Sequence, residues 1–228
     1  MATKTRAKAD VRTGKGKSGR RPPIRVKSGP DVPLLPIVVG AVLLALLIGM
    51  VAWIIYLNRP QPGPQVAAGI PCDHLEHTQV HYHAALQIIY HGVPVNLRDN
   101  TGIVFDSTGQ NVSCYYWLHV HAANKNVIHI ESPANQTFTV GQFFDVWNTW
   151  SNANGYGTIK LDGTHVAQFT LSSGDKIVVY IDLQDGKGPQ PYTGDPRAIV
   201  LKSHEIISIE ITPSDVNPPP SFTFPSGL

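Results

Sequence analysis

An alternation of apolar and polar side chains recurs along the chain after residue 72, and a long uninterrupted apolar run precedes it. Side chains on a β-strand point to opposite faces in turn, so this alternation predicts half-buried strands. The clearest case spans residues 79–90. His81 and His83 fall on its polar face, opposite the apolar residues Val80, Tyr82, Ala84, Leu86, Ile88 and Tyr90.

Residues 114–131 have the pattern of a β-hairpin with a short polar loop around residues 124–126. Tyr116, Leu118 and Val120 share one face of the first arm, and Ile128 and Ile130 share one face of the second. A one-residue slip would turn a whole arm over, so both aliphatic sets are expected to face the same core. The other face then gathers Trp117, His119, His121, His129 and Glu131.

Further short strands are expected at residues 101–105, 137–140, 158–161, 166–171, 176–183 and 206–211. The only good candidate for a soluble helix is residues 142–150, where Phe143, Phe144 and Trp147 have core-compatible spacing. Many short strands with one short helix predict an all-β domain, an antiparallel sandwich or barrel, over residues 72–212. The Pro-rich tail, residues 213–228, is expected to be disordered.

The apolar run covers residues 34–57 and contains no charged side chain. As a helix it would be about 36 Å long, enough to span a bilayer with some tilt. A signal peptide cleaved near residues 66–68 is the alternative, but the run is longer than a usual signal core, which favours a retained single-pass anchor. Residues 58–71, rich in Pro and Gly, are expected to form a linker.

Charge is distributed unevenly: residues 1–33 contain ten of the 18 Lys and Arg residues. With almost no large apolar side chains, this segment is expected to be disordered. A nucleic-acid-binding arm has the same composition, but the adjacent apolar run favours a topology signal at a lipid surface, and we expect no nucleic-acid partner. The positive-inside rule places the amino terminus in the cytoplasm and the β domain outside it.

All ten histidines follow residue 73, and three of them share a face of the hairpin. Imidazoles at i and i+2 of one strand, with a third from the adjacent strand, can reach one ion, so His119, His121 and His129 predict a Zn or Cu site. Glu131 is a candidate fourth ligand, orienter or general base, and its carboxylate leaves Fe²⁺ open.

Other histidines have several readings. His81 and His83 could supply further ligands to the same ion or form a second site, and the loop histidines His74 and His77 are weaker candidates. His204 is expected to be a structural hydrogen-bonding residue. The alternative without a metal is that the histidines on the polar face are only solvated. No methionine lies in the outer domain, which argues against a blue-copper site with its axial sulfur.

Cys72 and Cys114 are the only cysteines, and both would lie outside the cytoplasm. A pair in an oxidising compartment favours a disulfide, which would join the strand carrying His81 to the strand carrying His119. Ligation of a metal by the Cys114 thiolate is the competing role.

We find no sequence signature of nucleophilic catalysis or of phosphate binding. The sequence therefore supports three functions: metal binding in the outer domain, a metal-free accessory subunit of a larger membrane complex, and a small metalloenzyme with Glu131 as base. Enzymatic activity stays open.

Three segments carry a resemblance to a known group of proteins. These are residues 114–121 with 127–133, residues 138–147, and residues 196–207. Together they resemble a group of uncharacterised bacterial proteins with a Trp-Leu-His-x-His and Ile-His-Ile-Glu block in a membrane-anchored outer domain. The resemblance covers roughly residues 72–212 and implies these domain limits without implying an activity.

Overall fold

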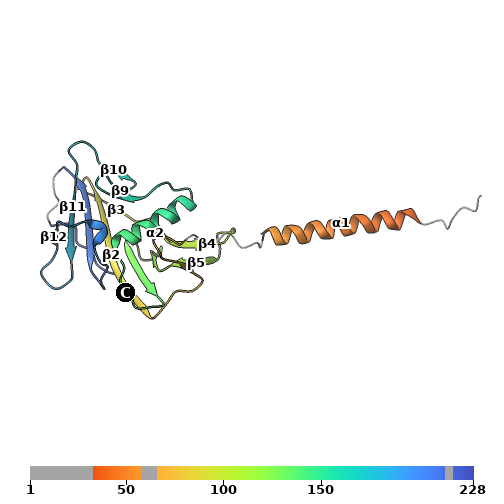
Figure 1. The fold of residues 1–228 in the computed structure, drawn as a ribbon, viewed down its shortest axis with the longest axis horizontal. Helices are drawn as coiled ribbons and strands as arrows, with labels where there is room; N and C mark the ends of the chain where they lie inside the picture. Colours follow the sequence, from red (N-terminus) through yellow and green to blue (C-terminus); the bar gives the residue numbers. More distant parts are fainter. Residues whose placement is uncertain (1–32, 58–65, 214–217) are drawn as a thin grey trace, which may run out of the picture. The chain divides into compact units, whose positions relative to one another are not determined.

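A computed structural model describes residues 33–57, 66–213 and 218–228 (Figure 1). The chain divides into two compact units, residues 1–56 and residues 57–228, and each is described by itself. Apart from Pro33, the predicted basic segment lies outside the described residues, as do residues 58–65 of the predicted linker.

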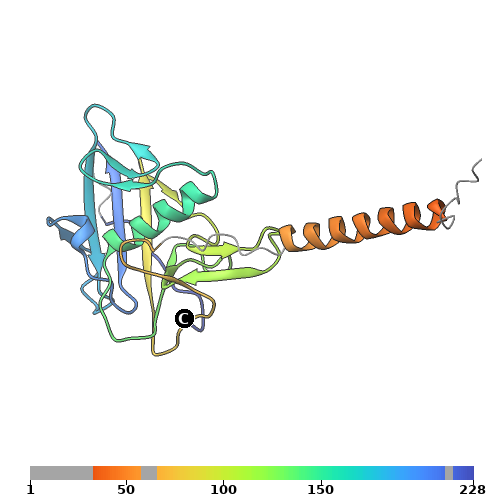
Figure 2. The same ribbon diagram turned by 45° about the vertical axis from the view of Figure 1, so that its right-hand side comes forward.

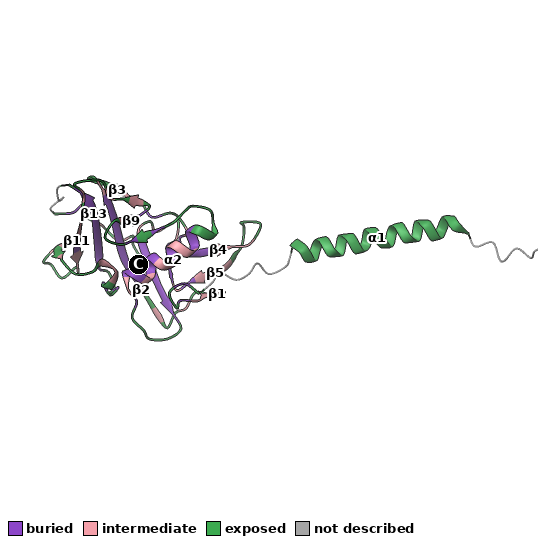
Figure 3. Cartoon of the chain, turned by 45° about the horizontal axis from the view of Figure 1, so that its top comes forward, coloured by how far each residue is buried: buried purple, intermediate pink, exposed green. Residues whose placement is uncertain are grey.

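The first unit contains α1 (Leu34–Leu57) except for its last residue, and the 24 residues of this helix include no charged side chain. None of its residues is buried, as the exposure colouring in Figure 3 shows. The helix is long and apolar enough to cross a membrane, which agrees with the predicted span, although a signal sequence has the same properties.

The second unit is built on an open seven-stranded sheet. Six strands lie in the order β12 (Gln190–Tyr192), β11 (Lys176–Asp182), β13 (Ile206–Thr212), β2 (Val80–Tyr90), β7 (Val127–Ser132) and β6 (Leu118–His119), and β3 (Val93–Val95) pairs with β2. The predicted all-β class is confirmed. All neighbours pair antiparallel except β13 and β2, which run parallel.

Two small antiparallel sheets complete the β structure. One contains β1 (Cys72–Asp73), β5 (Val112–Tyr116) and β4 (Ile103–Phe105), and the other contains β8 (Lys160–Leu161), β9 (His165–Ala167) and β10 (Phe169–Thr170). The segment between β11 and the 3₁₀ helix includes the edge strand β12, where Pro191 is tolerated because only one side of the strand is paired. A short 3₁₀ helix follows at Pro196–Ala198.

The helix α2 (Val140–Ala153) packs on one face of the large sheet (Figure 2). Alternation explains the contact, because the apolar side chains of β2 and β7 point to this face. Phe143, Phe144 and Trp147 are buried against them, as their spacing predicts. The core also includes Ala67 and Ile70, so packing of the domain begins inside the segment expected to be a linker.

The predicted strand at residues 137–140 is wrong. Only Thr139 forms an isolated bridge, to Val200, and the helix begins at Val140. The Thr139 hydroxyl accepts the backbone N–H of Gln142, while the Gln142 side chain accepts the backbone N–H of Thr139. This capping box ends the extended segment and starts the helix.

Thr139→Ala is expected to lower the free energy of unfolding by about 1 kcal/mol, because the first turn of α2 loses its side-chain acceptor. Chemical denaturation of the full chain in detergent measures this loss. Thr139→Ser keeps the acceptor and serves as the control, so equal losses in both variants would contradict the capping role.

The end of the tail, expected to be disordered, makes contacts in the described segment 218–228. The Phe224 ring packs edge-on against His204 with ring centroids 5.1 Å apart, and the Leu228 carbonyl lies 3.0 Å from His204 Nε2. These contacts give His204 the structural role that its position predicts.

Candidate metal centre

Three histidines form a row across the face of the sheet opposite α2. The strand register pairs His83 of β2 with His129 of β7, and His129 with His119 of β6. Next to this row, His81 of β2 is paired with Glu131 of β7. Directly paired residues on one face have Cβ atoms about 4.5–5.5 Å apart, so the register alone brings these side chains together.

Two further side chains join the row from segments outside the sheet ladders. His121 follows β6, and Glu76 lies in the loop between β1 and β2. We call the complete set the histidine cluster: Glu76, His81, His83, His119, His121, His129 and Glu131. The structure thus brings together all six side chains that the sequence indicates as ligands, and adds Glu76.

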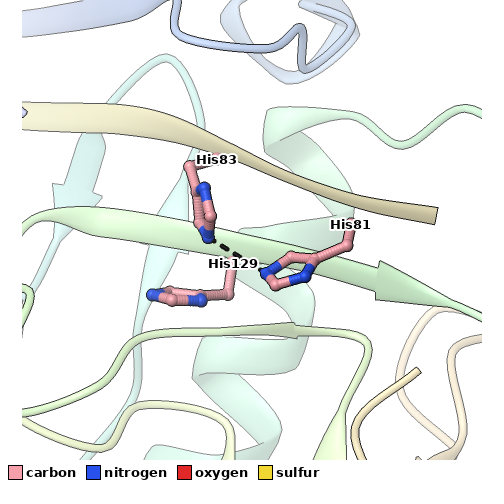
Figure 4. Close-up of side chains that lie close together, drawn as sticks. All are labelled: His81, His83 and His129. Carbon is pink, nitrogen blue, oxygen red and sulfur yellow. Dashed lines mark hydrogen bonds between the residues drawn. The ribbon is translucent and has the colours of Figure 1, made fainter. Parts of the chain in front are cut away.

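Each His-x-His pair directs its two Nε2 atoms toward one another. The Nε2 atoms of His81 and His83 are 3.2 Å apart, and Figure 4 shows them meeting beside the His129 ring. The Nε2 atoms of His119 and His121 are 3.1 Å apart. Ligands about 2.0–2.1 Å from a tetrahedral ion are separated by similar distances, so little movement is needed for both members of a pair to bind one ion.

Groups of three side chains in the cluster also have ligand atoms close enough to bind one ion. The ligand atoms of His81, His83 and His129 all lie within 4.8 Å of one another, and so do those of His119, His121 and His129. Glu76, His119 and Glu131 form a third such group. His129 is therefore common to both histidine pairs.

The centre of the cluster is buried and its rim is open to solvent. His119 is fully buried, and the exposed fractions of His129 and Glu131 are 5% and 3%. The His81 and Glu76 side chains are 44% and 39% exposed. An ion can therefore approach from the rim and reach donors inside.

Two buried atoms at the centre have no hydrogen-bond partner: His129 Nδ1 and Glu131 Oε2. The nearest approach between these residues, from His129 Nδ1 to Glu131 Oε1, is 3.6 Å, too long for a hydrogen bond. Buried polar atoms are almost always paired in folded proteins. Both residues belong to groups whose ligand atoms converge, and a cation bound there would supply the partner that these atoms lack.

The backbone fixes the orientation of the His119 ring. Its Nδ1 lies 2.8 Å from the Tyr116 carbonyl oxygen, so Nδ1–H donates and the neutral ring keeps a lone pair on Nε2. Metal-binding histidines usually donate their second nitrogen to such an acceptor. His129 Nε2 lies 3.4 Å from the Asn124 amide nitrogen; with the amide rotated to present its oxygen, Nε2–H would donate and free Nδ1 for an ion.

Burial and neighbouring imidazoles shift the pKa values of the cluster. Burial first, and then the charges of His129 and His81, lower the pKa of His83 to about 4. Burial followed by His119 and His129 lowers the pKa of His121. The nearby His119 ring, whose Nε2 lies 3.5 Å from Glu76 Oε1, is the main cause that lowers the pKa of Glu76. At neutral pH the two histidines are neutral and Glu76 is a carboxylate, which are the forms that bind metals.

The disulfide between Cys72 and Cys114 holds the segment that leads to Glu76. It joins β1 to β5 in a small sheet, and not β2 to β6 as the sequence indicated. It also excludes the cysteines as thiolate ligands in this state, since no described cysteine is free. Beyond it, Asp73 accepts hydrogen bonds from Trp117 Nε1 and His77 Nε2, both at 2.7 Å.

The other histidines lie outside the cluster and have separate partners. His77 binds Asp73, and His74 Nδ1 lies 2.7 Å from the Ser113 carbonyl oxygen. His91 pairs with Asp175 at 2.9 Å and His165 with Asp162 at 3.1 Å. They provide matched controls for variants of the cluster.

Sequence reasoning missed Glu76. Its Oε1 lies 3.0 Å from His121 Nε2 and 3.5 Å from His119 Nε2. The sequence does place Glu76 four residues after Cys72. The disulfide brings this segment close to the strand that precedes His119, so this position could have indicated Glu76 as a neighbour of the histidines.

Comparisons with protein-family models, with curated proteins and with solved structures find no match for this chain. The chemistry of the site is therefore inferred from its own donors. Three cavities in the described part, of about 520, 810 and 520 Å³, are lined by residues outside the cluster. The cluster donors converge on a space between side chains, as ligands of an ion do.

Glu205, outside the cluster, provides a pH-dependent test of the fold. Burial raises the pKa of its carboxyl from 4.5 to about 7, although the Lys202 N–H donates to it. The unfolded chain releases this proton at the lower pKa, so stability falls as pH rises from about 4.5 to about 7 and is level above that. In Glu205→Gln, the decrease in stability that Glu205 causes between about pH 4.5 and pH 7 should disappear. Denaturation of the metal-free protein at both ends of this window measures it, and identical pH profiles for the two proteins would contradict the assignment.

Proposed function

We propose that the histidine cluster binds a transition metal, Zn²⁺ or Cu²⁺. The observation that carries this proposal is the pair of buried unpartnered atoms, His129 Nδ1 and Glu131 Oε2, on residues whose ligand atoms converge with those of other histidines. Imidazole and carboxylate donors without sulfur suit both divalent ions. Glu131 is buried and 3.3 Å from His81 Nε2, which favours a role as ligand or orienter over a role as general base.

We further propose that α1 anchors the domain in a membrane with the amino terminus in the cytoplasm. The basic residues before the helix, its length and the disulfide of the β domain support this topology. A reporter fused after Leu228 should be active outside the cytoplasm. Activity of the fusion inside the cytoplasm would overturn the orientation.

Metal analysis of the purified full chain in detergent tests the binding function directly. We expect bound Zn or Cu after purification. After chelation, added Zn²⁺ or Cu²⁺ should raise the melting temperature, because an ion that binds only the folded state stabilises it. His91→Ala is the matched control and should behave as the wild type. A chain that carries no metal and shows no thermal response to either ion would refute the proposal and leave the accessory-subunit function.

A further inference from the structure

The donors of the histidine cluster divide into two similar sets around His129. Each set contains one His-x-His pair and one glutamate: His81, His83 and Glu131 in the first, and His119, His121 and Glu76 in the second. In the first set the glutamate is 3.3 Å from a ring nitrogen, and in the second 3.0 Å. The two sets come from different segments, so this similarity is not a consequence of one strand's register.

His129 lies between the two sets. Its ring centroid is 4.5 Å from that of His83 and 4.5 Å from that of His121, with both neighbours nearly perpendicular to it. Glu131 also reaches both sets, since its ligand atom lies within 4.8 Å of those of Glu76 and His119. Two central donors therefore face four imidazoles on opposite sides.

One ion cannot use all of these groups. Seven side chains offer donors, whereas Zn²⁺ in proteins is almost always bound by four. A single four-coordinate ion would therefore leave three of the seven donors unused. Two ions about 3.5–4 Å apart, with a shared carboxylate between them, are a common arrangement in binuclear sites.

We propose that the cluster is a binuclear site that binds two divalent transition-metal ions, one on each His-x-His pair, with the Glu131 carboxylate between them and His129 as a ligand of one of the two. This inference rests on the proposed metal binding and specifies its stoichiometry. Glu76 has a defined role in it as the carboxylate of the second ion. Glu76 lies outside the paired strands, in a loop that follows Cys72, and the disulfide holds this loop near His121.

Zinc stoichiometry of the full chain in detergent tests the proposal. After chelation, reloading with Zn²⁺ and desalting, we expect two ions per wild-type chain. His83→Ala and His121→Ala should each retain one, and His165→Ala should retain two. One ion in the wild type would overturn the binuclear site while preserving metal binding, and none would refute both. Two ions in either cluster variant would overturn the assignment of ligands.

Copper provides a second readout that does not depend on ion counting. Two Cu²⁺ ions at the separation of a binuclear site, about 3.5–4 Å, couple magnetically and lose the ordinary spectrum of an isolated ion. The fully loaded wild type should therefore show a coupled paramagnetic resonance signal, and His83→Ala the spectrum of one isolated ion. An uncoupled signal from two ions in the wild type would overturn the shared centre. Thermal unfolding of each variant establishes that it is folded.

Discussion

Replacing His129 with alanine is expected to lower Zn²⁺ affinity at least about 100-fold, the upper range for loss of groups that merely orient a ligand. His129 is the donor common to the two groups of three histidines, so its loss removes a ligand atom beside both His-x-His pairs. Zn²⁺ at about 100 times the wild-type Kd should stabilise the wild type by about 2.7 kcal/mol, and this gain should fall to about 0.4 kcal/mol or less in the variant.

Competition with a chromophoric chelator measures the affinity, and thermal unfolding with and without Zn²⁺ measures the gain. The metal-free variant should remain folded, because Nδ1 has no hydrogen-bond partner and the one hydrogen bond lost is the 3.4 Å contact of Nε2 with Asn124. His91→Ala removes a histidine that pairs with Asp175 outside the cluster and should bind as the wild type does. Wild-type affinity in His129→Ala would exclude this residue as a ligand.

Removing both cysteines, Cys72→Ala with Cys114→Ala, is expected to lower the free energy of unfolding by about 2–5 kcal/mol. The disulfide closes a loop with a sequence separation of 42, so its loss increases the entropy of the unfolded chain. For a chain of this size the melting temperature should fall by roughly 4–20 °C. Zn²⁺ affinity should fall too, because the segment that carries Glu76 follows β1 directly.

A reducing agent supplies the internal control for this prediction. In the absence of metal, it should lower the melting temperature of the wild type toward that of the double variant and leave the variant unchanged. Equal melting temperatures of all three samples would show that the disulfide contributes nothing to stability. Unchanged Zn²⁺ affinity would show that β1 is not needed to position Glu76.

The sequence predicts much of the cluster because its inner part depends on strand periodicity. His81 and His83 occupy the polar face of a strand whose other face is apolar, and the same argument places His119, His129 and Glu131. Side-chain alternation is local, so it can be read without knowing which strands are neighbours. The adjacency of β2 and β7, which joins the two groups, is visible only in the structure.

The remaining features depend on contacts between distant segments. The parallel pairing of β13 with β2 joins residues more than 100 positions apart, and no local pattern indicates it. Glu76 reaches His121 from a loop, where periodicity gives no direction. Thr139 has a residue type suited to strands, but its hydroxyl caps α2, and capping prevailed over strand propensity.

Anomalous diffraction at the zinc edge, from crystals of the Zn²⁺-loaded full chain, would locate the bound ions among the side chains of the histidine cluster. We expect anomalous peaks within bonding distance, about 2.0–2.2 Å, of the His119, His129 and Glu131 side chains. Zinc found only at other histidines, with His129 Nδ1 and Glu131 Oε2 still unpartnered, would contradict this expectation.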